Sequence, residues 1–179
     1  HYIIYTMKKT EEVINMEAYV MDAFSARIFG GNQAGVVLPD RPLSDAVMRQ
    51  IAAEMKHSET AFIHMEPDGS VSLRYFTPAG EVDLCGHATV ASFALLRQLE
   101  KIGDGDHTAH TKAGELNITV RGGTVWMDMA PPQLIGDIPA AERAALYAAY
   151  GLTEADCPEG YIPRMVSTGL ADIMMPVRD

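Results

Sequence analysis

A short polar loop delivers Cys85-Gly86-His87 to the start of an apolar run that extends to Leu99. This run predicts a helix, and the first residues of a helix carry backbone N–H groups without intrahelical partners, together with the positive end of the macrodipole. Carboxylates and other anions bind at such N-termini. The sequence therefore predicts a seat for the anionic group of a ligand. The residues expected to form it are Gly86, His87, Ala88 and Thr89.

Two side chains of this loop could take part in chemistry. A thiol beside a helix N-terminus can have a lowered pKa, so Cys85 could act as a nucleophile or base. A free cysteine is also often a small buried hydrophobe, and both interpretations stay open. His87 could donate a hydrogen bond to an anion or act as an acid or base, or it could simply cap and pack the helix.

Two more candidates lie outside the loop. Glu59 comes directly before an apolar run that predicts a strand, where partial burial would raise a carboxylate pKa toward the range useful for acid–base catalysis. The alternative is a solvated carboxylate on a loop. Asn32 lies in the glycine-rich segment Phe29–Gly35 and is its one residue with clear ligand-binding potential. That segment matches no phosphate-binding or dinucleotide-binding pattern.

No metal site is expected. The residues that could ligate one lack the His-x-x-x-His or Cys-x-x-Cys spacing of common metal sites. These residues are His57, His64, Cys85 and His87.

The composition limits the classes of partner. The chain has 179 residues, of which 47% are apolar, and a formal net charge of −10. An acidic chain without a basic stripe is a poor match for nucleic acid or an anionic membrane surface. No apolar stretch is long enough to span a membrane, and the two cysteines do not indicate a disulfide framework. We expect a cytoplasmic protein that acts on a small molecule.

Hydrophobic patterns predict the elements that would position these residues. A helix begins near Ser44 and ends near Lys56, and the apolar helix after Cys85 should be buried on nearly all sides. A third, shorter helix is predicted over 139–150. Strands are predicted over 17–24, 36–38, 58–63, 70–77, 107–111, 116–121, 124–129, 161–168 and 172–178.

These elements indicate an α+β domain of strands around one buried helix. We expect residues 1–15 to be a tag or an upstream extension, and the domain itself to cover residues 16–132. The pair of prolines at 131 and 132 indicates a boundary. Residues 133–179 are expected to hold a linker helix and the opening strands of a second, incomplete domain.

Several motifs occur together in one order along the chain, and together they closely resemble the phenazine biosynthesis-like (PhzF) family. The resemblance runs from about Met16 to Val177. The motifs are Asp22-Ala-Phe24, Phe29-Gly-Gly-Asn-Gln-Ala-Gly35, Ser58-Glu-Thr-Ala-Phe62, Phe76-Thr-Pro78, Glu81-Val-Asp-Leu-Cys-Gly-His-Ala-Thr89 and Ser167-Thr-Gly169.

The resemblance implies a diaminopimelate epimerase-like fold, in which two pseudo-symmetric domains each curl a β-barrel-like sheet around a central helix. It also implies an isomerase that needs no cofactor and moves a proton within a small, carboxylate-bearing substrate. The family's catalytic glutamate matches Glu59, and its substrate-positioning histidine matches His87. Cys85 matches the thiol base of the epimerase relatives, and a homodimer is expected.

Other functions stay open. The family's second half carries a Gly-Ser-Ala type motif that faces the first half, and this chain reaches Asp179 before any such motif. One alternative is a thiol-based amino-acid racemase or epimerase that uses Cys85. Another is a catalytically silent half-domain that associates with another chain, because unpaired strand edges and uncovered apolar faces favour association.

Overall fold

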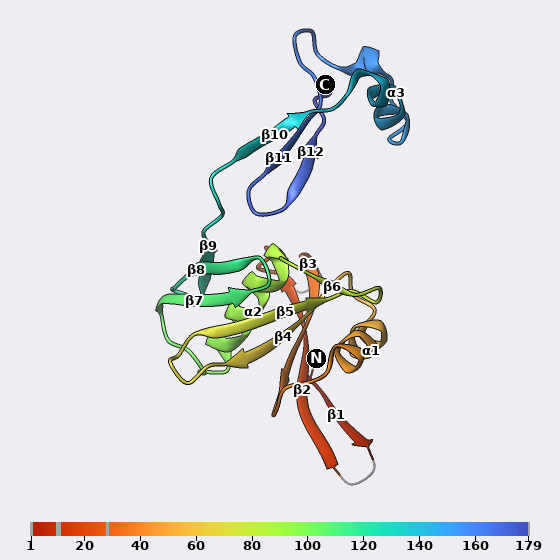
Figure 1. Cartoon of the computed structure of the whole chain (residues 1–179). Helices are drawn as coiled ribbons and strands as arrows, with labels where there is room; N and C mark the ends of the chain where they lie inside the picture. The colour runs from red at the N-terminus through yellow and green to blue at the C-terminus, as the bar shows by residue number, and fades with distance from the viewer. Residues whose placement is uncertain (1, 10–11, 28, 179) are drawn as a thin grey trace. The chain divides into compact units, whose positions relative to one another are not determined.

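The computed structural model describes residues 2–9, 12–27 and 29–178. The chain divides into two compact units, His1–Asp128 and Met129–Asp179 (Figure 1). The functional residues predicted above all lie in the first unit.

The described part of the first unit contains two helices and a curved sheet. The helices are α1 (Asp45–Met55) and α2 (Gly86–Gln98). The strands are β1 (Tyr2–Lys9), β2 (Glu12–Ala23), β3 (Asn32–Pro39), β4 (Thr60–Met65), β5 (Val71–Phe76), β6 (Glu81–Val82), β7 (Gly105–Thr111), β8 (Gly114–Arg121) and β9 (Thr124–Met127).

The strands form one sheet in the order β1-β2-β3-β4-β5-β7-β8-β9, and β6 pairs with β5. Most neighbours are antiparallel. The exceptions are β3 with β4, where Gly35 lies opposite Thr60, and β5 with β7. A parallel pair needs a crossover connection, and α1 and α2 lie in the two crossovers. The first crossover brings the starts of β3 and β4 to the same edge of the sheet.

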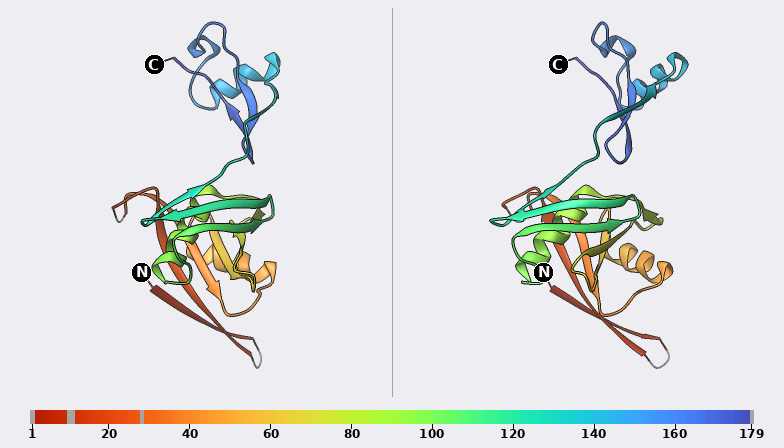
Figure 2. Two further views of the ribbon diagram at one scale, coloured as in Figure 1. Left: turned by 90° about the vertical axis from the view of Figure 1, so that its left-hand side faces the viewer. Right: turned by 60° about the vertical axis from the view of Figure 1, so that its left-hand side comes forward.

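The central strands are buried on both faces, and successive residues point to opposite sides. Val36 and Tyr75 pack in the cluster around α2, whereas their neighbours Val37 and Phe76 pack in the cluster beneath α1. The sheet curls around α2, and α1 covers its outer face (Figures 1 and 2). This arrangement confirms the predicted fold class, a curled sheet around a buried helix.

The burial of α2 follows from its sequence. Small and apolar residues lie on nearly every side of α2, so strands can pack against the helix from several directions. The less buried side of the helix runs through Val90 and Ala94. This confirms the predicted burial on nearly all sides. The buried residues are Ala88, Thr89, Ala91, Ser92, Phe93, Leu95 and Leu96.

The second unit is smaller. It contains β10 (Gln133–Asp137), α3 (Ala140–Ala148), a 3₁₀ turn η1 (Glu154–Asp156), β11 (Arg164–Ser167) and β12 (Ala171–Met174). The three strands form an antiparallel sheet in the order β10-β11-β12. Tyr147 of α3 is buried, and its hydroxyl donates a hydrogen bond to the Pro176 carbonyl at 2.7 Å.

The structure differs from the sequence predictions at several strands. Residues 2–9, for which no strand was predicted, form β1 and pair with residues 12–19. Strand β10 was not predicted, because its residues are mostly exposed and show no alternation of buried and exposed positions. Strand β12 ends at Met174 instead of continuing to residue 178. Among the described residues, no helix is both long and apolar enough to cross a membrane.

Candidate active site

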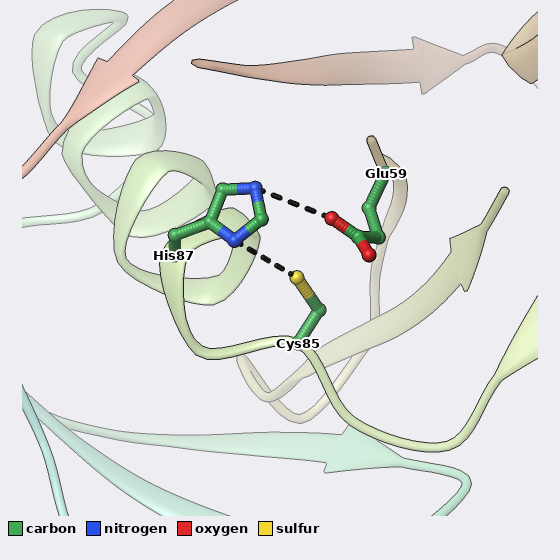
Figure 3. Close-up of side chains that lie close together, drawn as sticks. All are labelled: Glu59, Cys85 and His87. Atoms are coloured by element: carbon green, nitrogen blue, oxygen red, sulfur yellow. Dashed lines mark hydrogen bonds and ion pairs between the residues drawn. The ribbon is translucent and has the colours of Figure 1, made fainter. Parts of the chain in front are cut away.

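Glu59, Cys85 and His87 come together at the N-terminal end of α2 (Figure 3). Glu59 immediately precedes β4, and its carbonyl accepts a hydrogen bond of 3.1 Å from the Gly35 N–H. That bond belongs to the parallel pairing of β3 with β4, so the sheet fixes the backbone of Glu59. Cys85 is the N-cap of α2, and His87 is the second residue of the helix.

The imidazole ring of His87 faces the thiol through one nitrogen and the carboxylate through the other, and both groups lie on the same side of the ring (Figure 3). The Cys85 sulfur is 3.3 Å from His87 Nδ1, and Glu59 Oε2 is 3.5 Å from His87 Nε2. The His87 side chain is only 10% exposed and that of Glu59 is 25% exposed. His87 Nε2 is buried without a hydrogen-bond partner, because 3.5 Å exceeds the usual N–H···O distance. The ring therefore faces the carboxylate but makes no hydrogen bond to it.

Burial controls the protonation of Cys85. It raises the pKa of the thiol to about 11, and the negative charge of Glu59 adds to this effect. The backbone N–H groups of Ala88 and His87 act in the opposite direction, as expected at a helix N-terminus. Burial outweighs them, so the lowered pKa considered from the sequence is not found. Near neutral pH the thiol is protonated.

Thr89, one of the four residues predicted to form an anion seat, makes its hydrogen bonds within the protein. Thr89 is buried, and its N–H donates to the Cys85 carbonyl at 3.0 Å. Its hydroxyl donates to the same carbonyl at 2.7 Å and lies 2.6 Å from the Tyr75 hydroxyl. Thr89 therefore fixes the first turn of α2 rather than facing a ligand. The N–H groups of Gly86, His87 and Ala88 have no intrahelical acceptor, and those of His87 and Ala88 lie close enough to the Cys85 sulfur to lower its pKa.

Asn32 is exposed at the start of β3, where it pairs with Ala23. Since β3 and β4 are parallel, Asn32 lies at the same edge of the sheet as Glu59. Among the described residues, no hydrogen bond or ion pair joins Asn32 to Glu59, Cys85 or His87. Its role in substrate binding stays a prediction.

Tyr75 is a supporting residue that the sequence analysis missed. It is fully buried in β5, and its hydrogen bond to Thr89 ties the sheet to the first turn of α2. Burial raises the pKa of its hydroxyl, so the group stays neutral. The sequence did contain a sign of this role. Tyr75 occupies one of the alternating positions predicted to face the core, and a buried tyrosine hydroxyl needs a polar partner.

Asp22 is a second residue whose role was not predicted. One carboxylate oxygen accepts a 2.8 Å hydrogen bond from the Phe29 N–H and so closes the loop that leads to Asn32. The other oxygen is buried without a partner.

The three clustered side chains also offer one ligand atom each within 4.8 Å of one another. Sequence spacing could not reveal this group, because Glu59 comes from a different element than Cys85 and His87. His57 and His64, considered as ligands above, are not part of it.

Comparison with known proteins identifies the family of this chain. The model of the family described as phenazine biosynthesis-like protein matches residues 21–179. "Uncharacterized isomerase YddE" from Escherichia coli O157:H7 is 36% identical over 166 residues, which is 90% of this chain and 56% of that protein. The chain thus spans about half the length of the curated relatives it matches.

Solved structures agree. A PhzF-family phenazine biosynthesis protein from Bacillus anthracis superposes with a TM-score of 0.77 at 30% identity, over 92% of this chain and 56% of that chain. A hydroxyproline epimerase from Agrobacterium vitis superposes with a TM-score of 0.53 at 13% identity, over 87% and 50% of the two chains, and shares the fold alone. This chain belongs to the phenazine biosynthesis-like (PhzF) protein family, whose curated relatives include proteins named as isomerases.

Proposed function

We propose that this protein is an isomerase that moves a proton within a small, carboxylate-bearing substrate without a cofactor. Glu59 is the acid and base, and His87 steers the proton or holds the substrate. The observation that carries the proposal is the Glu59 carboxylate lying 3.5 Å from the buried His87 Nε2, beside the open N-terminus of α2.

The substrate carboxylate binds the N–H groups of Gly86, His87 and Ala88. Glu59 then removes a proton from a neighbouring substrate carbon: the C–H bond breaks, an O–H bond forms on Glu59, and the electron pair delocalises into the substrate. The positive end of α2 stabilises the developing negative charge. Glu59 returns the proton to a different carbon or to the other face, so no proton or electron is gained overall.

This assignment predicts solvent exchange. The protonated Glu59 can exchange with water before it returns the proton, so the substrate gains deuterium in D2O. Positioned acid–base groups contribute about 10²–10⁴-fold to rate, so Glu59→Gln should lower the exchange rate by at least a hundredfold. NMR or mass spectrometry of a panel of carboxylates, each beside its amide, measures this rate.

Glu54→Gln is the matched control, because Glu54 is an exposed glutamate on α1. It should leave exchange unchanged. Exchange that survives in Glu59→Gln at the wild-type rate would contradict the assignment, and exchange of amides as fast as carboxylates would contradict the anion seat.

A second candidate is a racemase or epimerase with Cys85 as a thiol base. The 3.3 Å distance from its sulfur to His87 Nδ1 favours it, since histidine could accept the thiol proton. The raised pKa of Cys85 disfavours it. Cys85→Ser separates the two functions: it should abolish thiol-dependent exchange and preserve Glu59-dependent exchange.

The partners and location belong to the same proposal. We infer a homodimer in the cytoplasm, supported by the acidic composition, by two free cysteines and by apolar side chains exposed in the second unit. A catalytically silent half-domain that pairs with another chain is the competing form. Light scattering combined with the exchange assay distinguishes an active dimer from an inactive associating domain.

A further inference from the structure

We propose that Glu59, Cys85 and His87 also bind a zinc ion, and that bound zinc blocks the proton transfer. Binding of the ion depends only on these three side chains. The inhibitory consequence rests on the proposed function.

The donor set fits zinc. A thiolate, an imidazole nitrogen and a carboxylate oxygen are its three usual protein ligands, and sites with three such ligands keep a fourth position open. Magnesium and calcium prefer oxygen ligands throughout. The present atoms lie within 4.8 Å of one another, and tetrahedral zinc separates its ligand atoms by about 3.3–3.8 Å, so closing on the ion needs movements of about 1 Å.

The state of His87 is an independent observation that points to a ligand. Its Nε2 is buried without a hydrogen-bond partner in a side chain that is only 10% exposed, and it faces the Glu59 carboxylate. A buried polar atom without a partner is costly, and coordination would satisfy it. In the absence of an ion, the thiol contacts Nδ1 of the ring and the carboxylate faces Nε2. An ion bound to one of these nitrogens would draw the sulfur and the carboxylate oxygen toward that same nitrogen.

Coordination also balances charge. The Cys85 thiol releases its proton to solvent and forms the sulfur–zinc bond, so a thiolate and the Glu59 carboxylate together neutralise the divalent ion. The Glu59 oxygen that would accept a substrate proton then shares its electron pair with zinc. Proton abstraction stops while the ion is bound, and it resumes when a chelator removes the ion.

Cobalt titration tests the binding without using activity. Co²⁺ replaces Zn²⁺ in such sites, and a cobalt–thiolate bond absorbs in the near ultraviolet. We expect this absorption to appear in the wild-type protein, to be displaced by Zn²⁺, and to be unaffected by Mg²⁺. Cys85→Ser should lose it, and Glu59→Gln and His87→Gln should weaken cobalt binding at least tenfold, with circular dichroism confirming that each variant is folded.

Cys157→Ser is the matched control, because Cys157 is the other free cysteine and lies in the second unit. It should keep the absorption. Absence of the absorption in the wild type, its persistence in Cys85→Ser, or its loss in folded Cys157→Ser would overturn the site.

Deuterium exchange at saturating Zn²⁺, followed by chelation, tests the inhibition. Exchange should fall at least tenfold and recover with the chelator, and exchange that continues under saturating zinc would overturn the inhibitory part. A wild-type protein that binds cobalt through Cys85 but exchanges no substrate would refute the proposed function and leave the zinc site standing.

Discussion

Helices α1 and α2 begin in the same way but differ in the charge of their first turns. Each follows an extended residue, Ser44 or Cys85, whose side chain makes no capping hydrogen bond. The first turn of α1 contains Asp45, which pairs with Arg74 at 2.9 Å, whereas the first turn of α2 contains no acidic residue. The positive end of α1 therefore has a carboxylate of its own chain, whereas the first turn of α2, where we propose that the substrate carboxylate binds, has none.

The two helix starts also differ in their support. Ser44 and Asp45 are exposed, whereas Thr89 in the first turn of α2 is buried and hydrogen-bonded to Tyr75 in β5. A surface helix start can move at little cost, but a buried one holds its N–H groups in fixed directions. The start of α1 is thus charged and exposed, whereas the start of α2, the helix of the proposed site, has no acidic residue and is anchored by buried side chains.

The largest expected effect comes from giving α2 the acid that α1 has. A Cβ at Gly86 would meet only the tip of Met127 at 3.6 Å, so Gly86→Asp should fold. Its carboxylate would occupy the seat, and like charges about 4 Å apart repel by about 4 kcal/mol at an effective dielectric constant of 20. We expect KM for a carboxylate substrate to rise about a hundredfold. Gly86→Asn is the control, and an equal rise in that variant would indicate a steric effect instead.

The next effect concerns the support of α2. Thr89→Val leaves the buried Tyr75 hydroxyl without its partner, and an unsatisfied buried group costs about 1–3 kcal/mol. Urea unfolding should show that loss of stability. Tyr75→Phe should cost less, because Thr89 keeps its bond to the Cys85 carbonyl. A larger cost for Tyr75→Phe than for Thr89→Val would contradict the proposed network.

The reactivity of the Cys85 thiol shows whether burial or the helix terminus dominates at the start of α2. Because burial raises the pKa of Cys85 to about 11, its thiolate is scarce at pH 8 and increases as the pH rises toward that value. The lower thiolate fraction is only partly offset by a higher intrinsic nucleophilicity. Cys85 should react with iodoacetamide more than tenfold slower than a free cysteine at pH 8. A rate already at its plateau at pH 8 would show that the helix terminus, and not burial, controls the thiol.

The smallest effect is expected at α1. Asp45 is 74% exposed, and exposed ion pairs contribute at most about 1 kcal/mol. Asp45→Asn should lower the free energy of unfolding by less than that and leave deuterium exchange unchanged. A measurable change in exchange would mean that the two helix starts are coupled.

Local sequence patterns were sufficient for much of the fold. The apolar run after Cys85 and the apolar face of residues 45–55 predicted both helices of the first unit, because burial imposes a helical period on the chain. The exposed strand β10 imposes no such pattern and was missed. Strand β1 was missed because residues 1–15 were set aside as a tag or extension, although Tyr2-Ile-Ile-Tyr5 is rich in strand-forming residues.

The site was less accessible from local patterns. Cys85 and His87 could be placed together from the loop–helix boundary, but the approach of Glu59 depends on the parallel pairing of β3 with β4. Only the resemblance to a known family connected the three residues beforehand. Tertiary packing decides whether burial or the helix terminus controls the pKa of Cys85. It also brings Thr89 into hydrogen-bond contact with Tyr75.

The central claim is that Glu59, and not Cys85, carries the proton. The most direct measurement compares deuterium incorporation into one substrate by the wild type, Glu59→Gln and Cys85→Ser under identical conditions. We expect Glu59→Gln to lose at least a hundredfold in rate, and Cys85→Ser to stay within about tenfold of the wild type. The reverse order, with Cys85→Ser inactive and Glu59→Gln active, would contradict it.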